Sequence, residues 1–459
     1  MKNFKYFWVI ALLLPLTNYA QSAHTLDSIP ENWGRDTTSI EEVQQVANWW
    51  KIFNDPVLNA LVEKTVQNNL NIKIAIQKIE QGRLLYKQSQ SGYYPSFAFN
   101  ISANTQNTQL QENDKSYAEL YNAGISMNWE IDVFGRVRKG VKVAKYSYEQ
   151  AQEDKNAVVV SLLSEVSSAY IRLRMYQNQI IVAESNITSQ QQALDLARDR
   201  YQNGMTSALD VYQSESIIYN TKASINTLRA QVINEVNLIQ VYIGEYPQNL
   251  KMALLQSAEL PNIPERLQTL LPVDVVRQRP DIRSAEKAMM GMVAQEELAK
   301  AEMLPSLAIT GNIGFSSVSA DTWFNNESMS YYVGPTLSWD IFQGMYKQRS
   351  KQIAKVQFQE AQLNYQNTIL TAMKEVENSL TNIKEYKEAY GWVEKTVDAS
   401  NNAFTISMDQ YRQGMIDYQP VLNSQQSLLS AQNEMVQTKG NLLGQIISLY
   451  QSLGGNWVE

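Results

Sequence analysis

The chain has 459 residues, of which 46 are acidic and 39 basic, so its net charge is −7. Binding to nucleic acid needs a basic face, so this charge argues against nucleic acid as a partner. There is no cysteine, which excludes disulfides, thiolate metal sites and lipidation on an N-terminal cysteine. The single histidine, His24, makes a histidine-based zinc site or a Ser-His-Asp triad implausible, and we expect neither a metal nor a cofactor.

The first twenty residues have the pattern of a secretory signal peptide. Lys2 and Lys5 give a basic start, residues 7–16 form an apolar core, and Ala20 offers a small residue for cleavage. A membrane anchor is the weaker alternative, because a spanning helix needs about 20 apolar residues. We expect an exported protein that begins near Gln21 and has no transmembrane helix.

Two halves of the chain are similar at a constant offset of 210 residues. The matching segments are Tyr94-Pro95-Ser96 with Leu304-Pro305-Ser306, Trp129-Glu130-Ile131 with Trp339-Asp340-Ile341, and Tyr201 to Met205 with Tyr411 to Met415. A period this long indicates a duplicated domain rather than a solenoid.

The repeat predicts how the chain is divided. The predicted segments are a signal peptide over 1–20, an irregular segment over 21–48, a first repeat over 49–245, a proline-marked linker over 246–272, and a second repeat over 273–459. Each repeat is expected to contain a helix, two strands, a very long helix, a glycine turn and a shorter helix.

Two segments of each half alternate apolar residues with small or polar ones, as strands with one apolar face do. Phe97, Phe99 and Ile101, for example, alternate with Ala98, Asn100 and Ser102. We predict strands at about 95–108, 118–132, 305–318 and 329–341. This pattern is typical of membrane β-barrels, and soluble hairpins packed on helices are the alternative.

Two tryptophans, Trp129 and Trp339, end their predicted strands. An aromatic girdle would lie at this level of a membrane barrel. Simple packing at a strand end is the alternative.

Each half also has a segment that predicts a very long helix. Between Arg136 and Asn203 the only glycine is Gly140, there is no proline, and apolar or small residues recur mostly at a 4-3-4-3 spacing. Such spacing is a coiled-coil seam, and it recurs 210 residues later. A helix of about 68 residues would be about 100 Å long, so it must pack side by side with similar helices.

The glycines Gly204 and Gly414 are expected to end these long helices. A shorter helix then runs back, roughly over 209–243 in the first half and 420–453 in the second. Each half would therefore form a helical hairpin with its tip at the glycine.

Four strands cannot close into a barrel by themselves. In lipid every backbone N–H and C=O needs a partner, and known barrels have at least eight strands. The open edges must therefore pair with other copies, two giving eight strands and three giving twelve. A polar strand face and a tube of helices together suggest a water-filled conduit.

Three segments resemble TolC-like outer membrane efflux proteins, more closely the NodT/OprM branch of RND tripartite efflux systems. They are Trp49-Trp50 with Phe53-Asn54-Asp55-Pro56, Trp129 to Arg136, and, most specific, Arg277-Gln278-Arg279-Pro280-Asp281-Ile282-Arg283. The likeness runs from about Trp49 to the C-terminus.

The resemblance implies an α+β membrane protein. Its fold would be a homotrimer that shares a twelve-stranded β-barrel in the bacterial outer membrane, continued through the periplasm by a long α-helical coiled-coil barrel. The resemblance also implies a passive exit duct for small molecules such as drugs or metals, with a periplasmic adaptor and an inner-membrane RND-type transporter as partners and no catalysis. A type I secretion exit duct, an exported coiled-coil interaction protein and a secreted hydrolase are the alternatives.

A lock at the closed periplasmic end is a further implication of the resemblance. The family's lock includes an aspartate of the first hairpin and a tyrosine of the second, which match Asp210 and Tyr411. A carboxylate–phenol hydrogen bond between them would be a reversible latch. The alternatives are an aspartate favoured by the helix dipole and a tyrosine that only packs.

Other family features of this end match less well. Relatives can carry a ring of acidic residues, whose positions match Pro420 and Asn423 here, with Asp417 close in sequence. The position of a lock arginine in some relatives matches Ile416 here, with Arg412 nearby. The turns Gly204-Met205-Thr206 and Gly414-Met415-Ile416 resemble the tips that meet the adaptor, and ordinary turn residues are the alternative. Many relatives also carry an acylated cysteine after the signal, which this chain lacks.

Overall fold

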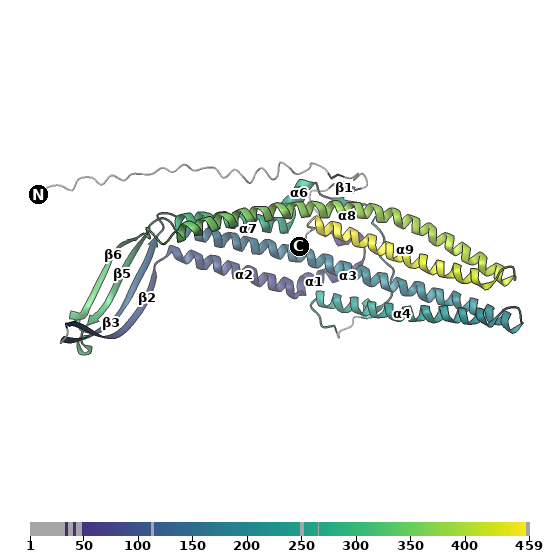
Figure 1. Cartoon of the computed structure of the whole chain (residues 1–459), viewed down its shortest axis with the longest axis horizontal. Coiled ribbons are helices and arrows are strands. Elements are labelled where there is room, and N and C mark those ends of the chain that lie inside the picture. Colours follow the sequence, from purple (N-terminus) through teal and green to yellow (C-terminus); the bar gives the residue numbers. More distant parts are fainter. Residues whose placement is uncertain are drawn as a thin grey trace.

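The computed structural model describes residues 33–34, 40–42, 48–111, 114–247, 252–264 and 266–455. The predicted signal peptide lies outside the described residues, as does most of the segment 21–48. The described chain is elongated, with a four-stranded sheet at one end and the tips of two helical hairpins at the other (Figure 1).

The sheet is antiparallel in the order β2-β3-β5-β6. The strands are β2 (Ser96–Gln111), β3 (Asp114–Ile131), β5 (Ser306–Ser317) and β6 (Met329–Ser338). The register places Phe99, Ile125, Ile313 and Tyr331 in one row across all four strands, and Asn100, Gly124, Gly314 and Ser330 in the next. The predicted alternation is therefore present, with one apolar face and one small or polar face.

Two features of the sheet go beyond the sequence expectation. β2 extends to Gln111, whereas the alternation predicted its end near 108. β3 begins at Asp114, whereas the alternation predicted its start near 118. Residues 104–109 are all polar, so they carry no alternating signal although their backbone pairs. Within the described chain, β2 and β6 each keep one edge without a neighbouring strand.

Four helices form the two hairpins. They are α3 (Arg136–Gln202), α4 (Ala208–Tyr242), α8 (Tyr346–Arg412) and α9 (Tyr418–Ser452). α3 and α8 have 67 residues each, about 100 Å of helix, and α4 and α9 have 35 each. Their bounds lie within two residues of those that the sequence predicted. Among the described residues, none of the helices combines the length and hydropathy needed to cross a membrane.

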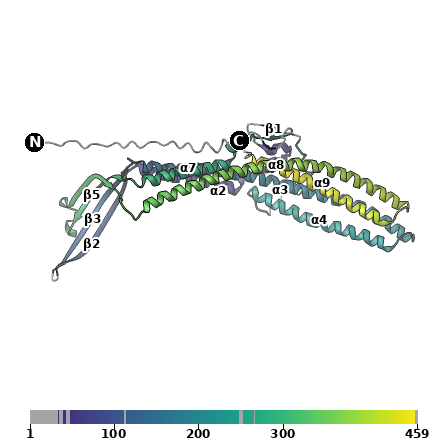
Figure 2. The same cartoon turned by 45° about the horizontal axis from the view of Figure 1, so that its top comes forward.

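Shorter helices line the sheet-proximal half. They are α1 (Pro56–Asn68), α2 (Leu70–Gln90), α6 (Pro272–Gln278) and α7 (Pro280–Ala301), with short 3-10 turns at η2 (Trp49–Phe53), η3 (Ser91–Tyr93), η4 (Ala320–Thr322) and η5 (Asn326–Ser328). α7 lies against α3 and α8, and α2 lies against α3 (Figure 2).

The N-terminal segment, which was expected to be irregular, and the linker each contain a short strand. In the N-terminal segment, β1 (Ile40–Glu42) pairs in parallel with β4 (Leu267–Thr269), which belongs to the expected linker together with α5 (Met252–Leu255). The expectation was wrong here because a three-residue bridge is held by backbone hydrogen bonds and needs no side-chain period.

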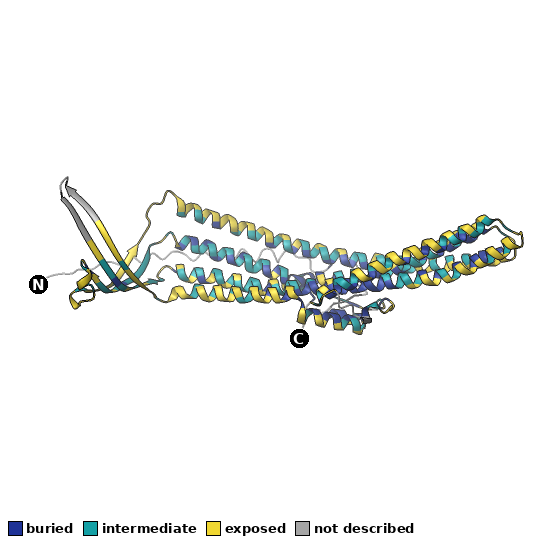
Figure 3. Ribbon diagram, turned by 90° about the horizontal axis from the view of Figure 1, so that it is seen from below, coloured by how far each residue is buried: buried dark blue, intermediate teal, exposed yellow. Residues whose placement is uncertain are grey.

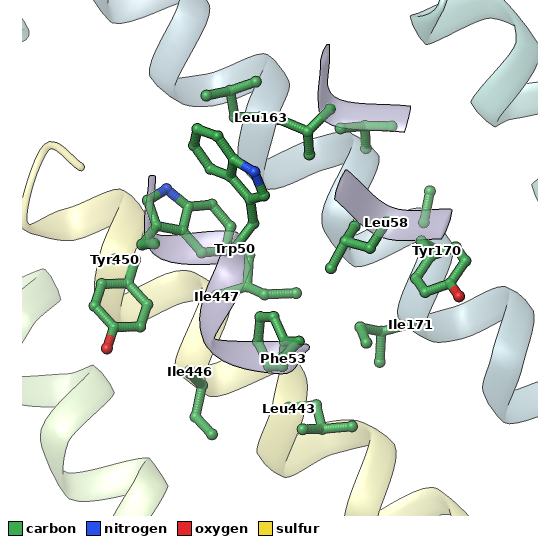
Figure 4. Packing of buried hydrophobic residues seen from close by; sticks show 14 of the residues in the cluster. Trp50, Phe53, Leu58, Leu163, Tyr170, Ile171, Leu443, Ile446, Ile447 and Tyr450 are labelled. Carbon is green, nitrogen blue, oxygen red and sulfur yellow. The ribbon is translucent and has the colours of Figure 1, made fainter. Parts of the chain in front are cut away.

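The main core lies midway along the molecule, where η2 inserts between α3 and α9 (Figure 4). Trp50, Phe53 and Leu58 are buried there against Leu163 and Ile447, among others. Burial is concentrated in this middle region and along the helix seams, whereas the tips and the outer strands β2 and β6 are mostly exposed (Figure 3).

The motifs that carried the family resemblance hold this core together. Trp49 stacks on Tyr450 of α9 with ring centroids 5.6 Å apart. The Arg279 guanidinium donates to both carboxylate oxygens of Asp281 at 2.9 and 2.7 Å, to Glu375 of α8 at 2.8 Å and to the Ser452 carbonyl at 2.9 Å. Arg279 therefore ties the junction of α6 and α7 to the end of α9 and to α8.

Candidate functional site

The helix tips form because each long helix ends in a left-handed glycine. Gly204 has φ +71° and Gly414 has φ +76°. The Met205 N–H donates to the Arg200 carbonyl at 2.8 Å and the Gly204 N–H to Tyr201 at 2.9 Å, and the second tip repeats both bonds. This is a Schellman motif, which satisfies the last carbonyls of the helix and reverses the chain.

Two polar contacts join the tips of the two hairpins. The Arg200 guanidinium of α3 donates to the Tyr411 carbonyl of α8 at 2.6 Å and lies over the Tyr411 ring at 4.7 Å. The Ser214 hydroxyl of α4 and the Tyr418 hydroxyl of α9 are hydrogen-bonded at 2.6 Å. Tyr411 and Tyr418 are buried side by side, with centroids 5.0 Å apart, so these two contacts are shielded from water.

The structure brings Asp210 and Tyr411 to the same place without a hydrogen bond between them. The Asp210 carboxylate accepts from the Thr206 hydroxyl one turn earlier. The Tyr411 hydroxyl is buried and has no hydrogen-bond partner among the described residues. Burial raises the pKa of the Tyr411 phenol, and the nearby negative charge of Asp210 raises it further. The pair is adjacent, but its role as a latch remains a prediction.

The other predicted gate residues lie on the outside of the tip. Arg412 donates to Asp409 at 3.1 Å within its own helix, and both side chains are exposed. Asp417 is the N-cap residue of α9, it is exposed, and its side chain makes no capping hydrogen bond. Neither residue joins the contacts between the hairpins, and their gating role also remains a prediction.

The turn residues expected to meet an adaptor divide into two groups. Met205 and Met415 are exposed, as a docking residue would be. Ile416 is half-buried and packs against the Tyr411–Tyr418 cluster, and Thr206 is half-buried and bonded to Asp210. Among these six turn residues, one methionine at each tip is therefore the large apolar side chain that is exposed.

The two predicted girdle tryptophans occupy equivalent positions. The Trp129 indole N–H donates to the Tyr93 carbonyl at 3.0 Å, and that of Trp339 donates to the Met303 carbonyl at 3.2 Å. The two donors are 210 residues apart in the sequence, and so are the two acceptors. Trp129 lies inside β3, whereas Trp339 follows the last residue of β6, and each fixes a strand end to the segment before its hairpin.

Sequence reasoning missed three tip residues, Arg200, Ser214 and Tyr418. A basic residue in the last turn of a helix, as at Arg200, is a general signal of a C-terminal contact. It also missed aromatic residues at the far end of the sheet, where Tyr121 packs on Trp323 with centroids 5.1 Å apart and Trp323 stacks on Phe324 at 4.9 Å. These two come from the β5–β6 loop, whose sequence has no periodic pattern.

The described residues include no cluster of three or more His, Cys, Asp or Glu side chains that could hold a metal ion. A sheet with one apolar face at one end, two helices about 100 Å long, and polar contacts between the hairpin tips at the other end are features of tubular membrane channels.

The comparisons with known proteins agree with this class. The family model described as outer membrane efflux protein matches residues 61–245 and 271–455. The chain belongs to this outer membrane efflux protein family, and it is a protein of the bacterial outer membrane that extends into the periplasm.

Similar proteins are found among both curated sequences and solved structures. The solvent efflux pump outer membrane protein SrpC of Pseudomonas putida is 27% identical over 417 residues, 89% of this chain and 87% of that protein. The cation efflux system protein CusC of Escherichia coli is 24% identical over 415 residues, 90% of this chain and 89% of that protein. The outer-membrane channel OprN superposes with a TM-score of 0.86 at 27% identity, covering 93% of this chain and 97% of that chain.

Proposed function

We propose that three copies of this chain form the outer membrane exit duct of a tripartite efflux pump. The observation that carries the proposal is the four-stranded sheet, which is apolar on one face and open at both β2 and β6. Lipid leaves no water to satisfy those edges, so the sheet must close on other copies. Three copies give twelve strands, continued by a tube of twelve hairpin helices.

The lumen of this duct is the small and polar face of the sheet. Asn100 of β2 donates to Ser126 of β3 at 3.1 Å, and Thr310 of β5 is bonded to Thr336 of β6 at 3.0 Å. Uncharged side chains of this kind favour passage of water and small solutes without a deep binding site. The duct does no chemistry, and the energy for export comes from the inner-membrane transporter.

The periplasmic end is the gate of the duct. Its hairpins are held together by the Arg200–Tyr411 and Ser214–Tyr418 contacts, with Asp210 beside Tyr411 and with Asp417 and Arg412 on the outside. Opening would separate the hairpins at these contacts. Met205 and Met415 would meet the hairpins of a periplasmic adaptor.

The transported molecules are small compounds, either apolar solvents and drugs or metal cations. The names of SrpC and CusC, solvent efflux and cation efflux, support small molecules over the proteins that a type I secretion duct would carry. The transporter selects the compound, so the duct itself needs no specificity pocket.

The experiment is single-particle imaging of the detergent-extracted mature protein, followed by reconstitution in planar bilayers. We expect the images to show a threefold particle well over 100 Å long, with a squat membrane end and a tapering tube. We expect the reconstituted protein to give discrete conductance steps. A water-soluble monomer or dimer would contradict the shared barrel.

A further inference from the structure

One tyrosine of the sheet lies on the polar face. The register places Tyr332 of β6 in a row with Asn312, Ser126 and Ala98, between the other polar rows. Side chains alternate along a strand, so the polar face carries the even-numbered residues of all four strands. Among these even-numbered residues Tyr332 is the only aromatic one, whereas its neighbour Tyr331 belongs to the apolar face with the other aromatic residues of the strands.

The residues around Tyr332 are too short to cover its ring. Tyr332 is 62% exposed. Asn312 lies opposite it on β5, and Ser330 and Gly334 are its neighbours along β6 on the same face. In a ring of copies the open edge of β6 would meet β2 of the next copy. The even-numbered residues in the first part of β2 are also short: Ser96, Ala98, Asn100 and Ser102.

The polar face is also the concave face of the sheet. Gly124 and Gly314 lie opposite each other in the row next to that of Tyr332. A Cβ on Gly124 would lie 3.2 Å from the Gly314 Cα, and a Cβ on Gly314 would lie 2.5 Å from the Gly124 Cα. The two strands therefore converge on the polar side, which only glycine permits. The ring of Tyr332 lies on the inside of this bend, where the lumen of a closed barrel would be.

Tyr332 is the one large residue in the part of the sheet where all four strands pair. Three polar rows span the four strands there, and the other eleven residues in them are Ser, Asn, Thr, Ala or Gly. Twelve strands about 4.8 Å apart and tilted by about 40° would enclose a lumen about 24 Å across between backbones. Copies in a ring are equivalent, so three phenol rings would reach into this lumen at one level.

We propose that Tyr332 determines the size of the solutes that can pass the outer part of the duct, because the rings of three copies form an aromatic constriction there. The inference rests on the proposed shared barrel, and it adds a size-determining residue to that barrel. Tyr332 is the fourth residue of β6, and this strand runs toward α8, so the constriction lies near the end of the sheet away from the helices (Figure 1). It is therefore separate from the gate at the helix tips.

The test measures how fast reagents of graded size reach a thiol that lies deeper in the lumen than Tyr332. The chain has no cysteine, so Ser338→Cys introduces a single thiol. Ser338 is an exposed residue of the same face, six residues and about 20 Å further along β6 toward the helices. Intact cells that carry this variant are treated from outside with a small charged maleimide or with maleimides on polyethylene glycol chains of increasing length.

Three further substitutions are compared in the Ser338→Cys background. Tyr332→Ser should raise the longest chain that labels the thiol, and at the parent's limit it should raise the labelling rate severalfold. Tyr332→Phe keeps the ring and should keep the parent's limit. Tyr331→Ser is the matched control, because it removes the same side chain from the next residue on the opposite face. The small maleimide should label all four proteins at similar rates.

The outcomes distinguish the constriction from the proposed function. An unchanged size limit with Tyr332→Ser, in cells where the small maleimide still labels the thiol, overturns the constriction and leaves the duct standing. An equal rise with Tyr331→Ser also overturns it, because the effect would then not depend on the lumen. If the small maleimide labels none of the four proteins although they assemble in the outer membrane, the polar face is not the lumen and the proposed duct fails as well.

Discussion

At the helix tips, two neighbouring tyrosines use their hydroxyls differently. The Tyr418 hydroxyl is bonded to Ser214 across the two hairpins, whereas the Tyr411 hydroxyl is buried without a partner among the described residues. Removing one partner of a buried hydrogen bond costs about 1–3 kcal/mol, but removing an unpaired hydroxyl costs little. If these contacts hold the tube shut, the two phenylalanine variants should differ.

We therefore predict that Tyr418→Phe raises the open probability or conductance of single channels in planar bilayers. Tyr411→Phe, the matched control, should leave both close to the parent values because its ring still packs under Arg200. The opposite result, with Tyr411→Phe opening the channel and Tyr418→Phe silent, would restore the Asp210–Tyr411 pair as the latch.

The same phenol predicts a response to alkaline pH. Burial is the main cause that raises the pKa of Tyr418 from 10.0 to about 12, and the Ser214 hydrogen bond partly offsets it. Between these values the unfolded chain has lost the proton that the folded tip keeps, so the contribution is present below pH 10 and is lost as pH rises toward 12. Its size is about 3 kcal/mol.

Thermal melting followed by circular dichroism at pH 9, 10, 11 and 12 checks this contribution. The melting temperature of the parent should fall more steeply above pH 10 than that of Tyr418→Phe. Parallel curves for the two proteins would mean that ionisation of other tyrosines dominates.

The tip also illustrates how far single residues could be predicted from sequence. The family resemblance singled out Asp210 and Tyr411, and both lie near the glycine turns at the ends of the hairpins, whereas their role in gating stays a prediction. Their partners were not predictable, since Thr206 competes for the Asp210 carboxylate and Arg200 reaches the Tyr411 backbone from another helix. Such contacts depend on how two hairpins twist about each other, which spacing along one helix does not encode.

Among the helices, the turn after α4 is sensitive to a single methyl group. Gly244 has φ +72°, and a Cβ at this position would lie 2.7 Å from the Asn68 carbonyl at the end of α1. Gly344, before α8, has φ +57° and open space around it. Alanine costs about 1 kcal/mol at either position for its left-handed backbone, and Gly244→Ala adds a backbone clash.

Gly244→Ala should consequently lower the melting temperature by several degrees more than Gly344→Ala. The comparison controls for backbone strain because both glycines have positive φ. Equal shifts would indicate that the end of α1 moves away at no cost, and that its contact with the turn after α4 is not a fixed part of the fold.

For the helices and strands, the sequence predicted the elements with a periodic side-chain pattern and missed those without one. The four strands and four long helices follow from periods of 2 and 3.5 residues and from two glycines. The extension of β2 to Gln111 and of β3 back to Asp114 was missed because most of the added residues are polar, and β1 and β4 were missed because three residues carry no period. Pairing by backbone alone leaves no trace in side-chain patterning.

Taken as a whole, the molecule depends on which face of its sheet meets lipid. Phe99 and Asn100 are consecutive in β2, so their side chains lie on opposite faces. Phe99 is 68% exposed and belongs to the apolar row, whereas Asn100 bonds to Ser126 on the polar face. A charged residue near the middle of the lipid face of a barrel costs about 2–4 kcal/mol, but one in the lumen changes selectivity.

These two positions give a paired prediction for the whole assembly. Phe99→Arg should reduce the amount of trimer recovered from outer membranes, since each trimer would place three arginines in lipid. Asn100→Arg should assemble normally and shift the reversal potential in a salt gradient toward anion selectivity, because three positive charges then line the lumen. Loss of trimer with Asn100→Arg alone would mean that the polar face meets lipid. The face that lines the lumen and the direction in which the sheet curves would then have to be reassigned. Only a barrel closed between copies, with its apolar face outward, makes one position a stability determinant and its neighbour a selectivity determinant.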